Sequence, residues 1–227
     1  MNNMKEMVFG FVPTKFDGTE YVITEENLGT LPLPNAYSYL PFMSPIMDQG
    51  STSTCVPHSI SAVYDYYIAM NHPELTNDGK FANSGISIQQ IYKSRTNYGE
   101  GMSYKEAFKF CLHKGVVSEQ DYKNKKFDKP MKIYMYGRVM SLEVLKRAIV
   151  ANGPCPIATM VRDIDRSDFW NGSGNYGGHA TCLIGYSDKK EAFILRNSWG
   201  RSFGSGGYVW FPYSDFDKIL EAWTVLI

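Results

Sequence analysis

The chain has 227 residues, 44% of them hydrophobic, which is enough for one large domain or two small lobes with a buried core. Lysine plus arginine and aspartate plus glutamate each total 23, so no net field attracts nucleic acid or an anionic membrane, and neither is an expected partner. No apolar run reaches the roughly 18 residues of a membrane helix, and residues 1–15 lack the basic and apolar segments of an export signal.

The cysteines argue against a metal site and against a disulfide framework. They lie far apart and form no C-x-x-C pair of the kind that marks zinc or redox sites. We therefore expect no metal and no cofactor. This cysteine usage is compatible with a reducing compartment such as the cytoplasm, but the sequence leaves the localisation open. The cysteines are Cys55, Cys111, Cys155 and Cys182.

The first 31 residues differ from the rest of the chain. They show weak strand character and end at the proline-punctuated stretch 31–34, which predicts an N-terminal extension of residues 1–31 and a main domain of residues 32–227. Aromatic anchors alternate with residues that disfavour a helix, so we expect an extended course along a groove. A strand packed on the β lobe and a partly disordered tail are the alternatives. The anchors are Phe9, Phe11, Phe16 and Tyr21, and the helix-disfavouring residues are Gly10, Pro13 and Gly18.

Helical patterns dominate the next part of the chain. Apolar residues recur on one face after Cys55, and polar N-cap residues open two shorter helices further on. An Asn-Gly-Pro sequence closes a fourth helix. The predicted helices are Cys55 to Asn71, Ser87 to about Ser94, Ser103 to about Gly115, and Leu142 to Val150.

Short β-branched and aromatic runs bounded by Gly, Asp and Lys dominate the last part of the chain, which predicts an antiparallel sheet or barrel. The expected fold class is therefore α+β, with a helical lobe at about residues 48–140 beside a β lobe at about residues 141–227. A junction of this kind commonly forms a cleft. The predicted strands are Pro156 to Val161, Ala180 to Tyr186, Ala192 to Arg196, Tyr208 to Phe211, and Trp223 to Ile227.

Cys55 is a candidate nucleophile because of its position. It follows a turn-prone run and opens the longest predicted helix, and a helix N-terminus favours a thiolate. Pro57 supports this helix start, because the first turn has no partner for a backbone N–H. An isolated cysteine is more often a small buried apolar residue, so the assignment depends on its partners.

A thiol nucleophile needs a base, and histidine is suited to this role near neutral pH. His58 lies three residues from Cys55 on the same helix, so it does not face the sulfur across a cleft. His72 and His113 lie near helix ends, where surface roles are commoner. His179 follows two glycines and opens a predicted strand. Its ring could therefore stand at a strand end that faces the Cys55 helix.

Asn197 is the third candidate, because it starts a turn after the strand that follows His179. An Asn carbonyl oxygen accepts a hydrogen bond from a His ring and so fixes the tautomer that serves a nucleophile. Trp199, two residues further on, could shield this bond from water. A turn Asn beside a packing Trp would explain either residue taken alone.

Taken together, these motifs resemble the papain family of cysteine peptidases, and the resemblance covers roughly residues 32–227. The order Gln, Cys, His, Asn matches the family, as do the separations of 6 residues from Gln49 to Cys55 and 18 from His179 to Asn197. Further similarity follows the first helix, precedes the first strand and follows the Asn motif. The quoted segments are Gln49-Gly50-Ser51, Cys55, Ile86-Ser87, Gln89, Gly153-Pro154, Gly178-His179-Ala180, Asn197-Ser198-Trp199-Gly200, Gly204, and Gly207-Tyr208.

The resemblance implies a papain-like two-lobe fold with the active-site cleft between the lobes, and an enzyme that hydrolyses peptide bonds through an acyl-enzyme intermediate. Cys55 would be the nucleophile, His179 the acid and base, and Asn197 the residue that orients His179. Gln49 would bind the oxyanion together with the Cys55 backbone N–H. Gly101, Met102, Gly178 and Trp199 would contact a peptide or protein substrate.

The sequence departs from the family in ways that affect the substrate groove. Thr52 stands where most members have a second cysteine, and Val56 replaces the Trp that commonly follows the nucleophile. Phe203 replaces the second Trp of the Asn motif. Met102 follows Gly101 where the family often has two glycines. These changes leave the shape of the substrate-binding subsites open.

The extension is shorter than the helical propeptide of most members and is closer in style to the leaders of bacterial-type members. It is a candidate pro-segment that occupies the cleft of a monomeric zymogen. Two alternative functions are a Cys-dependent acyl transferase or deamidase, which usually orients His with Asp, and a non-catalytic peptide-binding relative. The intact set of Gln49, Cys55, His179 and Asn197 disfavours the second alternative. The preferred substrate and the choice between endopeptidase and exopeptidase are not determined by the sequence.

Overall fold

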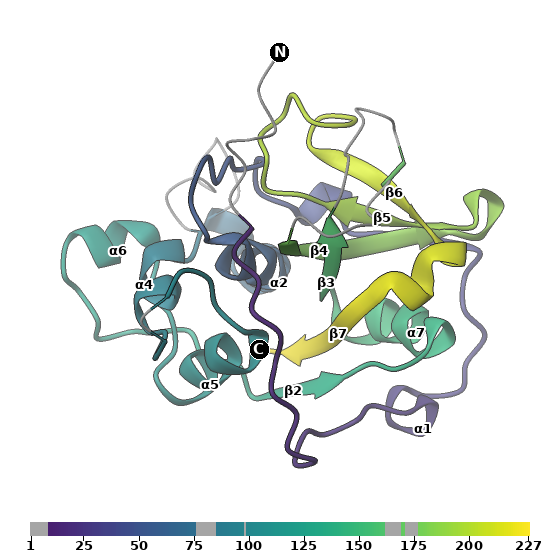
Figure 1. Cartoon of the computed structure of the whole chain (residues 1–227), viewed down its shortest axis with the longest axis horizontal. Coiled ribbons are helices and arrows are strands. Elements are labelled where there is room, and N and C mark those ends of the chain that lie inside the picture. The colour runs from purple at the N-terminus through teal and green to yellow at the C-terminus, as the bar shows by residue number, and fades with distance from the viewer. Residues whose placement is uncertain (1–8, 76–84, 98, 162–168, 171–176) are drawn as a thin grey trace.

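The computed structural model describes residues 9–75, 85–97, 99–161, 169–170 and 177–227. Its centre is an antiparallel sheet in the order β2-β7-β3-β4-β5-β6, and β1 pairs with β4. Figure 1 shows this sheet on one side of the molecule together with α1 and α7, and α4, α5 and α6 grouped on the other side. The strands are β1 (Ala36–Ser38), β2 (Met135–Arg138), β3 (Cys155–Val161), β4 (Gly177–Ser187), β5 (Ala192–Arg196), β6 (Tyr208–Pro212) and β7 (Ile219–Leu226).

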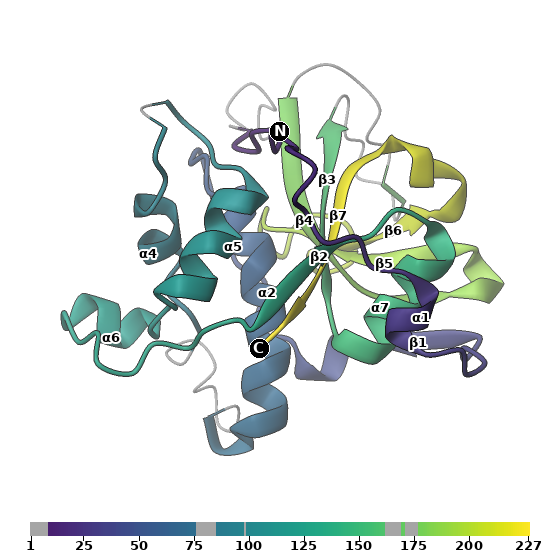
Figure 2. The same cartoon turned by 90° about the horizontal axis from the view of Figure 1, so that it is seen from below.

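One long helix, α2 (Cys55–Asn71), lies between the sheet and the group of α4, α5 and α6 (Figure 2). Its apolar positions fall on more than one face, so it packs on β4 as well as on α4 and α5. The remaining helices are α1 (Glu25–Leu28), α4 (Ile88–Lys93), α5 (Tyr104–His113), α6 (Glu119–Lys123) and α7 (Leu142–Asn152), and the 3-10 turns are η2 (Leu40–Phe42), η3 (Pro73–Leu75), η5 (Asp188–Lys190) and η6 (Tyr213–Lys218).

Two hydrophobic cores correspond to the two lobes. The first joins α7 to the sheet, with Leu145 and Phe193 fully buried. The second joins α2 and α5 to the other face of the sheet, with Ile60 and Phe108 fully buried and Trp223 of β7 beside them. Because α2 contributes to both cores, its N-terminus is held at the junction of the lobes. The α+β two-lobe prediction is confirmed.

Most predicted elements match the structure because their boundaries are local signals. Ser103 and Glu106 form the expected capping box of α5, and Ser87 caps α4 by accepting a hydrogen bond from the Gln90 N–H. The sequence did not predict α1, β1, β2 or α6. Two strands begin earlier than expected, β4 at Gly177 by three residues and β7 at Ile219 by four. The short strand β2 pairs with β7, so the sheet includes residues on the helical side of the predicted lobe division near residue 140.

The leader, defined here as residues 9–23, takes an extended course across the front of the molecule. In Figure 1 it descends between the small helices and the sheet, and in Figure 2 it crosses the ends of β2, β3 and β4. Isolated parallel bridges join Phe11 to Met102 and Val22 to Arg138. The predicted extended course is therefore seen, and it is followed by the short helix α1. Among the described residues, no helix is long and apolar enough to cross a membrane.

Candidate active site

Cys55 is the first residue of α2, as the sequence pattern predicts. The helix has Thr54 at its N-cap without a side-chain capping bond, and Pro57 lies in the first turn. The preceding loop is closed by Thr52, whose hydroxyl donates to the Gln49 carbonyl at 2.6 Å. The Cys55 side chain is fully buried, and its sulfur is approached by the backbone N–H groups of Ala180 and Gly10. Ala180 follows His179, so β4 brings that histidine to the start of α2.

His179 and Asn197 form the predicted pair. The His179 ring nitrogen Nε2 lies 2.9 Å from Asn197 Oδ1. The Ser198 backbone N–H donates to the same oxygen at 2.8 Å, which identifies it as the carbonyl oxygen of the amide. A carbonyl oxygen only accepts, so Nε2 carries the proton and Nδ1 has the free lone pair of a base. Nδ1 is buried and has no hydrogen-bond partner among the described residues.

Aromatic rings hold the His179 ring in this orientation. Trp199 stacks on it with ring centroids 4.4 Å apart and planes 21° apart. Phe203 packs edge-on against Trp199 at 4.9 Å, and Trp170 stacks with both rings, at 5.8 Å from Trp199 and 6.3 Å from His179. Phe203, which replaces the second Trp of the Asn motif, therefore packs directly against Trp199. Together these rings exclude water from the bond between His179 and Asn197.

Gln49 is hydrogen-bonded to the turn that contains Asn197. Its backbone N–H donates to the Ser198 carbonyl at 2.8 Å, and its side-chain Oε1 accepts from the Ser198 hydroxyl at 2.6 Å. Its side-chain Nε2 donates to the Thr52 carbonyl at 2.8 Å. These bonds fix the Gln49 amide between the Cys55 loop and the Asn197 turn.

The predicted substrate-contact residues line the path of the leader. The Met102 N–H donates to the Gly10 carbonyl at 2.8 Å, and the Met102 carbonyl accepts from the Val12 N–H at 3.0 Å. On the other wall, the Gly178 carbonyl accepts from the Phe11 N–H at 3.1 Å. A Cβ on Gly101 would lie 2.6 Å from the Gly10 carbonyl oxygen, so only glycine permits this approach.

The leader covers the thiol and the imidazole directly. A Cβ on Gly10 would lie 2.1 Å from the Ser53 carbonyl oxygen, so the backbone at Gly10 fits closely against the residues before Cys55. Phe9 packs edge-on against His179 at 6.2 Å and against Trp199 at 6.5 Å. With the leader in this position, Cys55 and His179 are both 0% exposed.

A second set of contacts anchors the leader beyond the cleft. Glu221 of β7 is buried and accepts hydrogen bonds from the Thr14 N–H, the Thr14 hydroxyl and Trp223 Nε1. Lys105 pairs with Asp17 at 2.9 Å and also with Glu20. Sequence patterns gave no signal for these contacts, because they join residues far apart in the chain.

The aromatic anchors of the leader are used unequally. Phe9 and Phe11 pack in the cleft, with Phe11 6% exposed. Phe16 stacks on Trp223 at 6.2 Å and carries the Arg138 guanidinium 3.6 Å from its ring centroid. Tyr21 is half exposed and contributes least. Phe9 and Phe11, the predicted anchors nearest Cys55, are therefore the ones that pack in the cleft.

Burial favours the neutral forms of the Cys55 thiol and the His179 imidazole in this arrangement. Loss of hydration raises the pKa of the Cys55 thiol to about 11, despite the nearby backbone N–H groups that favour the thiolate. The same cause lowers the pKa of His179 to about 4, despite the bond to Asn197. A thiolate–imidazolium pair is therefore disfavoured while the leader fills the cleft.

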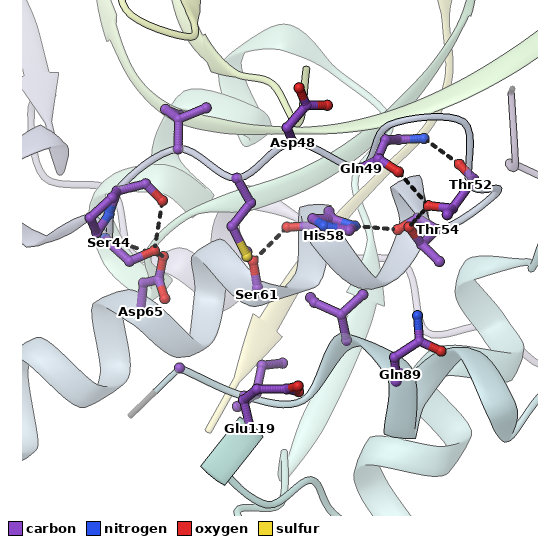
Figure 3. A pocket seen from close by; sticks show the side chains of 16 residues that line it. Ser44, Asp48, Gln49, Thr52, Thr54, His58, Ser61, Asp65, Gln89 and Glu119 are labelled. Atoms are coloured by element: carbon purple, nitrogen blue, oxygen red, sulfur yellow. Dashed lines mark hydrogen bonds between the residues drawn. The ribbon is translucent and has the colours of Figure 1, made fainter. Parts of the chain in front are cut away.

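The other histidines lie in different surroundings. His72 pairs with Glu74 at 3.5 Å near the end of α2, and His113 is exposed at the end of α5. His58 lines a pocket of about 490 Å³, together with Asp48, Gln49 and Glu119 (Figure 3). The remaining cysteines, Cys111, Cys155 and Cys182, are buried and free.

Solved structures with this architecture define the fold. Xylellain, a cysteine protease from Xylella fastidiosa, has a TM-score of 0.75 at 21% identity, with 97% of this chain and 96% of that chain covered. Procathepsin L2 from the larval midgut of Tenebrio molitor has a TM-score of 0.75 at 19% identity, with 99% and 79% covered. The fold is therefore that of papain-like cysteine proteases.

Sequence comparison shows the family. The model of the papain family cysteine protease matches residues 39–218, and this chain belongs to that family. It is 24% identical over 217 residues to an uncharacterized peptidase C1-like protein of Acanthamoeba polyphaga mimivirus, covering 79% of this chain and 68% of that protein. It is 29% identical over 143 residues to fruit bromelain of Ananas comosus, covering 55% of this chain and 41% of the relative. The chain therefore spans less than half of the length of fruit bromelain. A closer relation to bacterial-type members stays a prediction.

Proposed function

We propose that this chain hydrolyses peptide bonds of peptide or protein substrates with Cys55, His179 and Asn197 as its catalytic triad. The observation that carries the proposal is the bond from His179 Nε2 to Asn197 at 2.9 Å, which leaves Nδ1 as a base. The Ala180 N–H at the Cys55 sulfur supports the same arrangement.

The proposed reaction proceeds through an acyl-enzyme. His179 Nδ1 takes the thiol proton while Cys55 Sγ forms a bond to the substrate carbonyl carbon. The resulting oxyanion is stabilised by the Cys55 backbone N–H and the Gln49 side-chain amide. His179 then gives the proton to the leaving amine, and the C–N bond breaks. Water attacks the thioester carbon while His179 accepts a proton from that water. The C–S bond then breaks, His179 returns the proton to the Cys55 sulfur, and the carboxylic acid product leaves.

We also propose that the leader keeps the enzyme latent. It blocks the thiol sterically, and the Met102 N–H holds its Gly10 carbonyl by a hydrogen bond. A tethered segment acts at a high effective concentration, so weak contacts suffice. The neighbour procathepsin L2 and proCathepsin B S9 from Trypanosoma congolense, which has a TM-score of 0.71 at 17% identity, are named as proforms.

Labelling with an epoxide that traps papain-type thiolates tests the nucleophile. We expect modification of Cys55 and not of Cys111, Cys155 or Cys182, and faster labelling of a chain that begins at Leu31 than of the full-length chain. Labelling spread evenly over the four cysteines would contradict the assignment.

Equal initial peptidase rates for the two folded chains, full-length and beginning at Leu31, would rule out latency. The choice between hydrolysis and acyl transfer is made by assaying the products with and without an added amine acceptor.

A further inference from the structure

Glu221 is a buried acidic side chain whose hydrogen-bond donors are all neutral. It is 3% exposed, and it accepts from the Thr14 N–H, the Thr14 hydroxyl and the Trp223 indole N–H. Acidic side chains are almost never fully buried unless they are paired. Two of these three donors belong to the leader. When the leader leaves the cleft, only the Trp223 donor of the three remains.

Strand pairing places Glu221 in one row with the Cys55 site. Glu221 of β7 lies opposite Ala158 of β3, and Ala158 lies opposite Ala180 of β4. Directly paired residues of antiparallel strands carry their side chains on the same face of the sheet. This is the cleft face, because both alanines pack in one hydrophobic cluster with Cys55. Two strand spacings, about 10 Å in all, separate Glu221 from Ala180, whose N–H approaches the Cys55 sulfur.

The side chains between Glu221 and the thiol are small, and an extended segment already lies over them. Ala158 and Ala180 end at Cβ, and Phe11 of the leader packs in the same cluster as both. Further along the leader, Thr14 reaches Glu221. The row therefore accommodates an extended peptide whose side chains point toward the sheet, and the row ends at a carboxylate.

The course of the leader indicates which part of a substrate would face Glu221. The leader packs Phe9 against His179 and meets Glu221 with Thr14, and it passes the Cys55 sulfur between these two points. In the proposed reaction His179 gives a proton to the leaving amine, so that amine lies beside the His179 ring. Glu221 lies on the other side of Cys55 along this path and thus faces the acyl part of the substrate.

We propose that Glu221 selects substrates that carry a lysine or arginine side chain within the two residues before the cleaved bond. The inference rests on the proposed peptidase function. The apolar stem of such a side chain would lie over Ala158 and Ala180 while its charged head binds the carboxylate. A charge-assisted hydrogen bond is roughly twice as strong as a neutral one, so the cation more than replaces the donors that leave with the leader. An acidic side chain at the same place is disfavoured by like charge.

Arg138 is a cation on the same face of the sheet and defines the competing arrangement. It lies opposite Trp223 in the pairing of β2 with β7, and its guanidinium lies 3.6 Å from the ring centroid of Phe16 in the leader. If Arg138 turned to Glu221 once the leader had left, it would neutralise the carboxylate and abolish the preference. The experiment therefore includes a variant of this residue.

Competition between two peptide epoxides tests the preference at Cys55 of the full-length protein. The reagents differ only in carrying lysine or norleucine, first at one and then at the other of the two residues next to the epoxide. The ratio of their labelling rates is independent of the fraction of protein whose leader is displaced. We expect the lysine reagent to label Cys55 about 10-fold faster at one of these positions, the effect of one hydrogen bond to a charged group. Glu221→Gln should bring this ratio close to one.

Two further variants serve as controls. Glu100→Gln removes an exposed acid next to Gly101, on the other wall of the cleft, and should leave the ratio unchanged. Arg138→Gln should also leave it unchanged.

Equal labelling by the two reagents in the wild-type protein would overturn the inference, and this comparison needs no variant to fold. A preference retained in folded Glu221→Gln, or one that appears only in Arg138→Gln, would overturn it as well. Failure of the proposed function is distinct, because neither reagent would then label Cys55 in any of these proteins, and the inference would fall with it.

Discussion

Glu221 of β7 accepts two hydrogen bonds from Thr14 in the leader, one from its N–H at 2.6 Å and one from its hydroxyl at 2.8 Å. Both residues are buried, although 207 positions separate them in the chain. A hydrogen bond to a charged group contributes about 1.5–3 kcal/mol. This pair therefore contributes strongly to holding the leader over the Cys55 helix.

Thr14→Val should weaken the binding of the leader to the cleft, because it removes the hydroxyl that donates to Glu221. The loss of one bond to a carboxylate predicts about a 10- to 100-fold weaker hold on the cleft. The measurement is the initial peptidase rate of the full-length protein, which should rise. Thr30→Val is the matched control, because Thr30 is exposed, and it should leave the rate unchanged. An unchanged rate in Thr14→Val itself would show that Thr14 does not control access.

Gly10→Ala should displace the leader for a steric reason. The added Cβ would lie 2.1 Å from the Ser53 carbonyl oxygen, and a backbone atom cannot give way as the end of a flexible side chain can. We expect a higher initial rate and faster alkylation of Cys55 in the full-length protein. Gly99→Ala is the control, since open space surrounds that position. A crystal structure of Gly10→Ala with residues 9–12 unmoved would contradict the argument.

The pH dependence of Cys55 alkylation should change when the leader is removed. With the leader in place, burial raises the pKa of Cys55 to about 11, so the alkylation rate should still be rising above pH 9. Removal of the leader restores hydration and lowers this pKa, so the rate should level off at a lower pH and increase on the order of 100-fold at pH 7.5. Iodoacetamide labelling followed by peptide mapping measures both profiles. A rate increase without a shift of the midpoint would indicate a change of access alone.

Asp65→Ala should destabilise the fold near the Asn197 turn. Asp65 and Arg196 are almost fully buried and form an ion pair at 3.2 Å, and Asp65 also accepts from the Ser44 hydroxyl at 2.5 Å. Removing one partner leaves a buried charge, at a cost of about 3–5 kcal/mol. Asp215→Ala, which breaks a partly exposed pair with Lys218, should cost less than about 1 kcal/mol. Urea unfolding of the two variants compares these free energies, and equal losses would contradict the prediction.

Local signals in the sequence predicted the elements that bear the candidate triad. A turn-prone run before Cys55 and a proline in the first turn mark the start of α2, and Ser103 with Glu106 marks the start of α5. These signals act over three or four residues, where backbone hydrogen bonds and side-chain caps decide the structure. The resemblance to a family then predicted which side chains meet, because spacing alone left Cys55 and His179 as separate candidates.

Tertiary structure decided what the sequence left open. The short strands β1 and β2 are stabilised by their pairing with β4 and β7, and such pairing depends on partners distant in the chain. The sequence predicted an extended leader but did not determine where it lies. In the structure, Met102, Gly178 and Glu221 provide its hydrogen-bond partners. The pKa values of Cys55 and His179 likewise follow from burial, which is a property of the packed molecule. The sequence by itself determined the residue types and local turns of this protein, and long-range packing determined which of those residues are covered, paired and kept neutral.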